Sequence, residues 1–488
     1  MKKADLSLNG MKTRVEKDFL GTRELPQAAY YGINALRGQE NFPITGLPMP
    51  ESLITAIAMV KKAAAQANRD AARLDSQLAD AIVKASDEVI NGQFHDQFIV
   101  DPIQGGAGTS FNMNANEVIA NRALEILGQE KGSYHIISPL DHVNMGQSTN
   151  DAVPTAVHIA AANELALLLE EMTRLHAAFG DCSKRFDTMI KMGRTHLQDA
   201  VPIRLGQEFH AYQQVTGRDI KRISGERESL FAVNLGATAV GTGLNADVKY
   251  VKRVVHHLAK ISGLPLKQAG DLVDATQNAD AYTTVSSTLK ICMLNMSKIA
   301  NDLRLMASGP RCGLGELKLP PRQSGSSIMP GKVNPVMAEV VNQVAFQVAG
   351  NDLTISMAAE AGQFELNVME PVIIRNLLES IFIMRNVFRV FRMFLLEGLA
   401  ANEEKMRSYV EHSAGVVTAF APYIGYEKAA EIAKASLESG RPVRALLLEK
   451  KLISPAEADI ILDAREMTKI GIAGLEAVQA LRNKKKKK

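Results

Sequence analysis

The 488-residue sequence has no tryptophan and only three cysteines. Cys182, Cys292 and Cys312 are an odd number and lie far apart, so their spacing predicts neither a disulfide framework nor a zinc site. A reducing cytosol fits this cysteine usage best, and we expect a cytoplasmic protein. The N-terminus begins with basic residues but lacks the apolar run of a signal peptide, and no uncharged stretch is long enough to cross a bilayer. These absences argue against a secreted or membrane-spanning protein.

A strong excess of positive charge is also absent. The formal net charge is +3, and because the last five residues are all lysine, the rest of the chain carries three minus five, or −2. The lysine run at 484–488 has no interleaved aromatic residues and no amphipathic pattern, which favours a solvated tail over a nucleic-acid or membrane contact. Residues 1–10, before Met11, are expected to be a loose extension. We therefore expect no nucleic-acid and no membrane partner.

Apolar residues are abundant, at 46% of the chain, and they follow helical spacing over long distances. The stretch from Ala281 to Ser308 contains no glycine or proline, and its apolar residues recur at steps of three and four, which is typical of a helix-bundle seam. Three such seams are predicted: Val285, Leu289, Cys292, Met296, Ile299, Leu303 and Met306; Leu165, Leu168, Met172, Leu175 and Phe179; and Leu377, Ile381, Met384, Phe388, Phe391 and Leu395.

Strand-like alternation is scarce, so we predict an all-α protein with a long central helix bundle. We divide the chain into an N-terminal domain (1–145), a central helix-bundle domain (146–400) and a small C-terminal helical domain that ends in the lysine tail (401–488). A long, thin bundle with apolar seams on several faces commonly buries the remainder against sister subunits, so we expect an oligomer.

One connection is too long for a simple helix bundle. The segment "PRCGLGELKLPPRQSGSSIMPGKVNP", 310–335, joins two helical stretches that would normally need two to eight residues. Its glycines and lysine do not match a phosphate loop, because Gly325 and Gly331 enclose five residues rather than four and Val333 stands where a Ser or Thr would hold magnesium. A nucleotide site is therefore disfavoured.

The same segment carries groups that suit a carboxylate substrate. Lys332 and Asn334 precede the start of a helix after Pro335, where a carboxylate would be bound favourably. Ser326 or Ser327 would act as a base if backbone N–H groups stabilised its alkoxide. The alternative is that both serines only satisfy backbone groups in a turn, and taken alone this alternative is favoured.

Three further polar stretches raise the same question. "GGAGTSFNMNANE" offers Thr109, "GQSTNDAVPT" offers Ser148, Thr149 and Asn150, and "GRTHLQDAVP" offers Thr195 and His196. Each has a structural alternative, since a hydroxyl before a helix is often an N-cap and a lone histidine is usually a solvated or satisfied side chain.

Together these stretches supply hydroxyls, amides, one imidazole and one lysine. They show no metal-ligand spacing, no paired catalytic carboxylates and no dinucleotide fingerprint, so we expect neither a metal nor a cofactor. Such a set of groups suits a small dicarboxylate with a weakly acidic C–H bond.

The wording of these stretches resembles a known family. "GSSIMPGKVNP" is similar to the signature of the aspartase/fumarase superfamily, and the resemblance extends over nearly the whole chain. "QFIVDPIQGGAGTSFNMNANEVIANRALE", "HVNMGQSTNDAVPTAVHIA", "KMGRTHLQDAVP" and "GQFELNVMEPV" are most similar to its ammonia-lyase branch.

The resemblance implies a homotetramer with a core of twenty helices and composite active sites that each draw on three subunits. It implies reversible deamination of L-aspartate to fumarate and ammonia, with Ser326 as the general base that removes a proton from Cβ. The resemblance implies that the β-carboxylate of the substrate is bound by Thr109, Ser148, Thr149 and Ser327. It implies that the α-carboxylate is bound by Thr195, Lys332 and Asn334. The amino group of the substrate would face Asn150 and His196, with Thr195. Fumarate hydratase, which shares the dianionic intermediate, and a catalytically silent structural relative are the alternatives.

Two positions depart from the family pattern. Gly146 stands where a serine or cysteine is expected, and Leu140 replaces an expected asparagine. Gly146 lies just before the Ser148 cluster, so the loop there is expected to be looser, and neither change affects a residue with an implied catalytic role.

Overall fold

A computed structural model describes residues 12–486, with side chains up to Lys484. The extension at residues 1–10 and residues 487–488 of the lysine tail lie outside the described residues. The chain divides into two compact units. The first contains the chain up to Glu170, Ile220–Met293 and Val344–Arg385; the second contains Glu171–Asp219, Leu294–Gln343 and the chain from Asn386 onward. The division into three domains at 145 and 400 stays a prediction.

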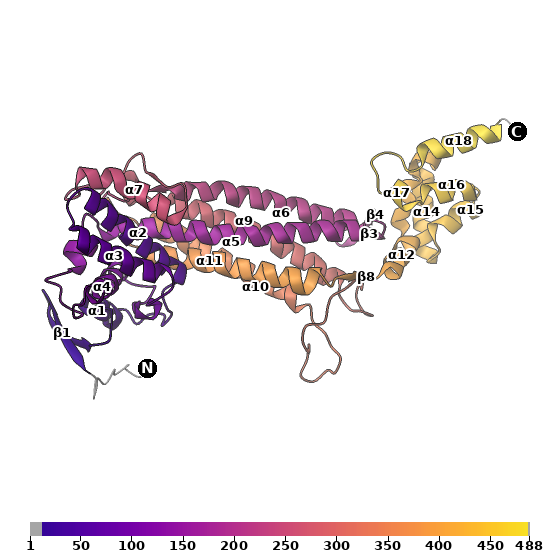
Figure 1. Ribbon diagram of the computed structural model, residues 1–488. Helices are drawn as coiled ribbons and strands as arrows, with labels where there is room; N and C mark the ends of the chain where they lie inside the picture. The colour runs from indigo at the N-terminus through magenta and orange to yellow at the C-terminus, as the bar shows by residue number, and fades with distance from the viewer. Residues whose placement is uncertain (1–11, 487–488) are drawn as a thin grey trace. The chain divides into compact units, whose positions relative to one another are not determined.

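Long helices dominate the fold, and five of them contribute residues to both units (Figure 1). They are α5 (Thr149–Arg185), α6 (Leu205–Arg227), α9 (Asp280–Met306), α10 (Val336–Glu360) and α11 (Glu370–Phe391), which is followed by the π-helical turn η4 (Arg392–Leu396). Every seam residue predicted on α5, α9, α11 and η4 is buried. The predicted all-α fold with a helix bundle is therefore confirmed.

Helix α5 is long and apolar enough to cross a membrane by length and composition alone. About two thirds of its most apolar window is buried inside the fold, with Leu165, Leu168 and Met172 fully inaccessible. A buried core helix accounts for this composition, and within the described residues no other helix meets the same criteria.

The first unit begins with a hairpin and a layer of shorter helices. Its elements are β1 (Thr13–Asp18), β2 (Gly21–Pro26), α1 (Ile33–Asn41), α2 (Glu51–Asp70), α3 (Ser76–Ile90), η1 (His95–Gln97), α4 (Thr109–Ile126), the π-helical turn η2 (Pro139–Val143), η3 (Glu228–Phe231), β5 (Ala232–Val233), α7 (Val248–Ser262), β6 (Lys267–Gln268) and α8 (Asp274–Gln277). Helix α2 packs against α3 and α7.

Helix α1 has no side-chain cap of its own and borrows one from α4. The buried carboxylate of Glu117 accepts hydrogen bonds from the backbone N–H groups of Gly32, Asn34 and Ala35. A Cβ on Gly32 would lie 2.7 Å from the Glu117 carboxyl carbon, so this close approach requires glycine. The bond fixes α1 to the helix that carries Thr109.

The second unit contains a β-hairpin and the C-terminal helices. Its elements are β3 (Ile190–Thr195), β4 (Gln198–Arg204), β7 (Leu317–Lys318), β8 (Ala400–Ala401), α12 (Glu403–His412), η5 (Ala414–Ala419), α13 (Ala421–Ile424), α14 (Tyr426–Ser439), α15 (Val443–Glu449), α16 (Pro455–Ile461), α17 (Ala464–Met467) and α18 (Leu475–Lys486). Met192 of β3 packs into the apolar core of these helices with Phe420 and Ile432. The hairpin is thereby held against the C-terminal helices.

The strands in the described part of the chain form four two-stranded sheets. Three are antiparallel pairs, β1 with β2, β3 with β4 and β7 with β8, whereas β5 pairs with β6 in parallel. None forms an extended sheet.

Candidate active site

Thr195 and His196 lie at the tip of the β3–β4 hairpin, in the second unit. Thr195 pairs with Gln198, so only His196 and Leu197 form the turn, with φ angles of 55° and 60°. A two-residue turn with both φ values positive is the type that suits the twist of a hairpin, and it usually contains Asn and Gly. A histidine and a leucine in this conformation are strained, and strain of this kind is concentrated at functional sites.

Buried charges hold this hairpin in place. Arg194 donates a 2.9 Å hydrogen bond to Glu316, which is fully buried, and the ammonium of Lys191 lies 3.5 Å from the other oxygen of the same carboxylate. On the second strand, Asp199 accepts a 2.8 Å hydrogen bond from the hydroxyl of Ser413. Because Glu316 belongs to the 310–335 connection, the hairpin and that connection share one anchor.

Ser326 lies in this connection, which runs outside regular helix between α9 and α10 (Figure 1). Its side-chain oxygen accepts hydrogen bonds from the backbone N–H groups of Ile328, at 3.2 Å, and Met329, at 3.0 Å. Ser326 is half-buried, whereas the side chain of Ile328 is 84% exposed. Two N–H donors aimed at one serine oxygen would stabilise negative charge on that oxygen.

The ends of this short loop are closed by Gly325, Lys332 and Asn334. Gly325 donates its N–H to the carbonyl of Lys332 at 2.8 Å and accepts a 2.9 Å hydrogen bond from the Asn334 amide. A Cβ on Gly325 would lie 2.5 Å from the Lys332 carbonyl oxygen, so the closure requires glycine. The side chains of Ser327 and Lys332 are exposed. The loop therefore presents a hydroxyl and an ammonium to solvent beside Ser326.

Ser148, Thr149 and Asn150 lie at the start of α5, in the first unit. Ser148 is the residue of the three that caps the helix, since its oxygen accepts from the N–H of Asn150 at 3.2 Å. Asn150 donates from its amide to the carbonyl of Ala239 at 2.8 Å, and Thr149 is buried. The capping interpretation thus explains one hydroxyl and leaves Thr149 and Asn150 for another role.

The loop before α5 is fixed by a buried carboxylate that the sequence did not single out. Asp151 accepts hydrogen bonds from the backbone N–H groups of Ser148, Gly236 and Thr238, at 2.9, 3.0 and 3.0 Å. Burial raises the pKa of Asp151 to about 6, although the three hydrogen bonds act in the opposite direction and lower it. The carboxylate ties Ser148 to the segment that follows β5.

Lys61 is a second buried residue that the sequence analysis did not single out and that supports the cluster at the start of α5. Its buried ammonium donates to the side-chain oxygens of Asn112, Asn144 and Gln147, at 2.7, 2.9 and 2.9 Å. Asn112 in turn donates to the hydroxyl of Thr149 at 3.3 Å. Burial lowers the pKa of Lys61 to about 7. Lys61 therefore acts on Thr149 through Asn112, as a positioning residue.

Gly146 does not leave an open space in this loop. It has a φ of +73°, and a Cβ there would lie 3.2 Å from the ring of Tyr250, which is fully buried. The tyrosine ring packs where a larger residue would place its side chain. The sequence-based expectation of a looser loop is therefore not supported by the packing at this position.

Thr109 is the first residue of α4, in the first unit, and it is exposed. Its hydroxyl donates to the carbonyl of Gly106 at 2.7 Å, whereas the first turn of the helix is capped by Gln104, whose side-chain oxygen accepts from the N–H of Phe111 at 3.0 Å. The interpretation of Thr109 or Ser110 as the N-cap is therefore wrong. The N-cap position is Gly108, whose backbone is in the left-handed region, and the helix already includes Thr109.

The structure therefore brings the candidate residues together in three clusters. Ser148, Thr149 and Asn150 share one network in the first unit with Lys61 and Asp151, while Thr109 lies at the start of a neighbouring helix of that unit. In the second unit, Thr195 ends the strand that leads into the hairpin turn and His196 lies in that turn. Ser326, Ser327, Lys332 and Asn334 share the loop between α9 and α10 of the same unit.

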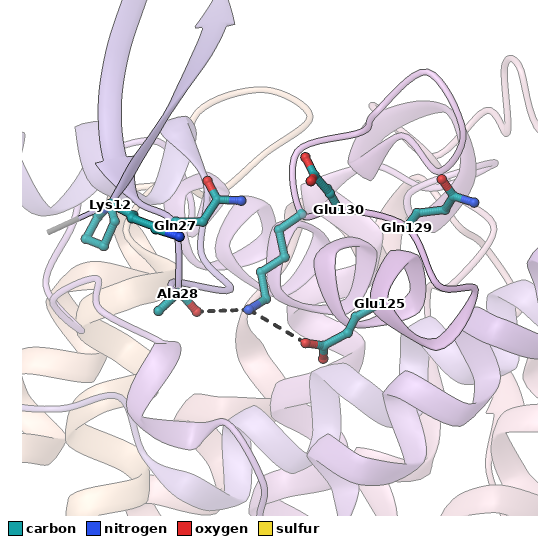
Figure 2. A pocket seen from close by; sticks show the side chains of 8 residues that line it. Lys12, Gln27, Ala28, Glu125, Gln129 and Glu130 are labelled. Carbon is teal, nitrogen blue, oxygen red and sulfur yellow. Dashed lines mark hydrogen bonds and ion pairs between the residues drawn. The ribbon is translucent and has the colours of Figure 1, made fainter.

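A wide surface cavity of about 550 Å³ in the first unit contains none of these residues (Figure 2). Lys131 lines this cavity. Its ammonium nitrogen lies 3.2 Å from the carbonyl oxygen of Ala28, 3.8 Å from the carboxylate of Glu125 and 4.0 Å from the centre of the Tyr30 ring. These groups satisfy one another at the surface. The described residues contain no cluster of three or more His, Cys, Asp or Glu side chains that could hold a metal ion.

Comparison with known proteins gives a consistent assignment. A lyase family model matches residues 21–350, and a model of the fumarase C C-terminus matches residues 416–469. An aspartate ammonia-lyase of Bacillus subtilis is 63% identical over 97% of this chain and 100% of its own, and one of Pseudomonas aeruginosa is 52% identical over 92% and 96%.

Solved structures agree with this assignment. A fumarate lyase:delta crystallin from Brucella melitensis bound to cobalt has a TM-score of 0.91 and 48% identity, and a class II fumarase from Schistosoma mansoni has a TM-score of 0.89 and 35% identity. Each alignment covers 93% of this chain and 99% of the other. The chain belongs to the aspartase/fumarase superfamily of lyases.

Proposed function

We propose that the protein catalyses the reversible deamination of L-aspartate to fumarate and ammonia. Similarity to aspartate ammonia-lyases over nearly the full length supports the choice of substrate. The observation that carries the chemistry is the pair of backbone N–H groups, from Ile328 and Met329, directed at the side-chain oxygen of Ser326. A serine hydroxyl is a poor base, and these donors lower the cost of forming its alkoxide.

In the proposed reaction, Ser326 removes the proton from Cβ of aspartate. The electron pair left on Cβ spreads into the neighbouring carboxylate as an enediolate-like dianion, which preorganised donors stabilise. The pair then forms the carbon–carbon double bond of fumarate while the bond from Cα to the amino nitrogen breaks and ammonia leaves. The loop of Ser326 would close over substrate and exclude water, which strengthens each of these interactions.

The remaining candidate residues bind substrate in this proposal. Their hydroxyl, amide and ammonium groups are donors, as a doubly charged anion requires. We assign the β-carboxylate to Thr109, Ser148, Thr149 and Ser327, the α-carboxylate to Thr195, Lys332 and Asn334, and the amino group to Asn150 and His196, with Thr195 between the two.

The substrate is tested by ultraviolet absorbance of fumarate, with L-aspartate in one cuvette and L-malate in another. We expect fumarate from aspartate alone. Fumarate from malate alone would assign the protein as a fumarase, the activity suggested by its similarity to the class II enzyme. Silence with both would favour a structural role or a bulkier succinyl substrate.

Lys332→Ala is expected to raise KM for L-aspartate by about 10- to 100-fold and to leave kcat nearly unchanged, because it removes a charged hydrogen bond to a group that does not react. Steady-state kinetics measure both constants. Lys318→Ala, an exposed lysine in β7 of the same connection, is the matched control and should behave like the unchanged protein. An unchanged KM in the Lys332 variant would remove it from the α-carboxylate site.

The proposed assembly is a homotetramer whose active sites draw on three subunits. It is supported by an apolar stripe on α10: Phe346, Leu353 and Met357 follow steps of seven and four, and each is more than 60% exposed in the single chain. Light scattering at micromolar concentration should give four times the chain mass. Phe346→Glu should reduce that mass, whereas Phe364→Glu, an exposed phenylalanine between α10 and α11, should not. A monomer mass for the unchanged protein would contradict the proposal.

We also propose a cytoplasmic location without nucleic-acid or membrane partners. Cys182, Cys292 and Cys312 form no disulfide in the described part of the chain, and Cys312 is exposed. An exposed free thiol is compatible with a reducing compartment.

A further inference from the structure

A second cavity, in the first unit, is lined by none of the candidate site residues, although Asn234 in its wall donates a 3.0 Å hydrogen bond to the carbonyl of Asn150. Its volume is about 240 Å³, and its walls come from the second and third turns of α5, the first turn of α9, the segments around β5 and α8, and the first residue of α11. The proposed reaction makes no use of it.

The base of this cavity holds a buried glutamate without a partner. Glu370, the first residue of α11, is 6% exposed and lines the cavity. Its oxygen Oε2 is inaccessible to solvent and has no hydrogen-bond partner in the described part of the chain. Burial raises the pKa of Glu370 to about 8. An unpaired buried carboxyl group is costly, so a ligand in the cavity that donates to the other carboxyl oxygen of Glu370 would relieve part of that cost.

The charges around the cavity are of one sign. Three exposed aspartates, Asp271, Asp274 and Asp280, line it, and no lysine or arginine does. The imidazole of His158 does not offset these charges, because burial lowers its pKa to about 4 and its Nδ1 lies 3.1 Å from the carbonyl oxygen of Leu230. The cavity therefore favours a cation.

The acceptor groups and the aromatic wall of the cavity indicate which kind of cation would fit. The acidic side chains that line the cavity are not grouped closely enough to hold a metal ion directly, and no such group of three occurs among the described residues, so a cation that binds through hydrogen bonds fits better. The rings of His158 and Tyr282 pack edge to face, 5.2 Å apart, and both line the cavity, where an aromatic wall also favours an ammonium group. A water molecule occupies about 30 Å³ of liquid, so the space admits several heavy atoms.

We propose that this cavity binds a small primary ammonium ion, with its N–H groups donating to Glu370 and its charge balanced by the aspartates at the mouth. The inference is independent of the proposed function, since none of these residues belongs to the proposed active site.

The test is the shift in thermal midpoint of the full-length protein with methylammonium chloride, measured at constant ionic strength against tetramethylammonium chloride. Methylammonium should raise the midpoint, because a ligand that binds only the folded state stabilises it, whereas tetramethylammonium has no N–H donor and should not. Glu370→Gln should weaken the methylammonium response at least tenfold in concentration. A wild-type midpoint that does not respond to methylammonium overturns the proposal, and so does an unchanged response in the variant.

Two further variants separate the site from general effects on folding. Glu51→Gln is the matched control, because Glu51 is an exposed first residue of α2 and should keep the full response. Asp280→Asn changes the exposed mouth, so it provides the comparison if Glu370→Gln does not fold, and it should weaken the response severalfold. An Asp280 variant that responds like the Glu51 control would also overturn the proposal.

Discussion

Ser326→Ala is expected to lower kcat for L-aspartate by about 10³-fold and to leave the oligomer intact. A positioned base typically contributes 10²- to 10⁴-fold, and alanine leaves no group that can accept the Cβ proton. KM should change little, because Ser326 is not assigned to either carboxylate of the substrate. Steady-state kinetics on the purified variant, with light scattering on the same sample, measure both expectations.

The control for this experiment lies two residues away. Ser324 is exposed, and its hydroxyl donates to the carbonyl of Ser326 at 3.2 Å. Ser324→Ala removes one hydrogen bond to the backbone of Ser326 but leaves the hydroxyl of the proposed base in place, and it should retain most of the activity. A loss of less than tenfold in kcat for Ser326→Ala would contradict the assignment of Ser326 as the base. Equal losses in both variants would indicate a general effect on the loop.

Glu316→Ala is expected to destabilise the folded protein by about 3–5 kcal/mol. The carboxylate is fully buried, and its removal would leave the charges of Lys191 and Arg194 without this partner. Lys191 would keep its 2.8 Å ion pair with Glu208. We therefore expect Arg194 to lose its charge partner and the hairpin that carries His196 to be the part of the fold that is most displaced. Denaturant unfolding at one fixed protein concentration measures the change in free energy.

Glu404→Ala provides the comparison for stability. Glu404 is exposed in the first turn of α12, in the same unit, and its loss should change the free energy of unfolding by less than about 0.5 kcal/mol. Equal stability of the two variants would contradict the role of Glu316 as the anchor of the hairpin. A lower kcat in Glu316→Ala at a temperature where it stays folded would link that anchor to the position of His196.

The helices were predictable because their signal is periodic and local. Leu165, Leu168 and Met172 recur at helical spacing, and burial follows directly from that spacing. The β3–β4 hairpin was missed for the opposite reason. Its strands are short and contain charged residues, and its turn uses His196 and Leu197 instead of the Asn and Gly that normally mark such a turn. Packing of Met192 against the C-terminal helices stabilises it, and no local pattern shows that contact.

The supporting charges of the site were missed because their partners are distant in sequence. Lys61 follows an apolar run and precedes an alanine-rich one, where a lysine normally points to solvent, and the oxygens that it contacts come from Asn112, Asn144 and Gln147. Glu316 is buried by partners more than a hundred residues earlier in the chain. By contrast, the residues proposed to meet substrate were all found in contiguous polar stretches, and their roles stay predictions.

The exposed side chain of Ile328 makes the loop of Ser326 accessible to fluorescence spectroscopy. The chain contains no tryptophan, so Ile328→Trp would introduce a single tryptophan per chain, which can be excited selectively over the nine tyrosines and reports from one known position. Tryptophan emission moves to shorter wavelength when the indole leaves water. Stopped-flow mixing with an unreactive dicarboxylate would then time the movement of this loop separately from any bond-breaking step.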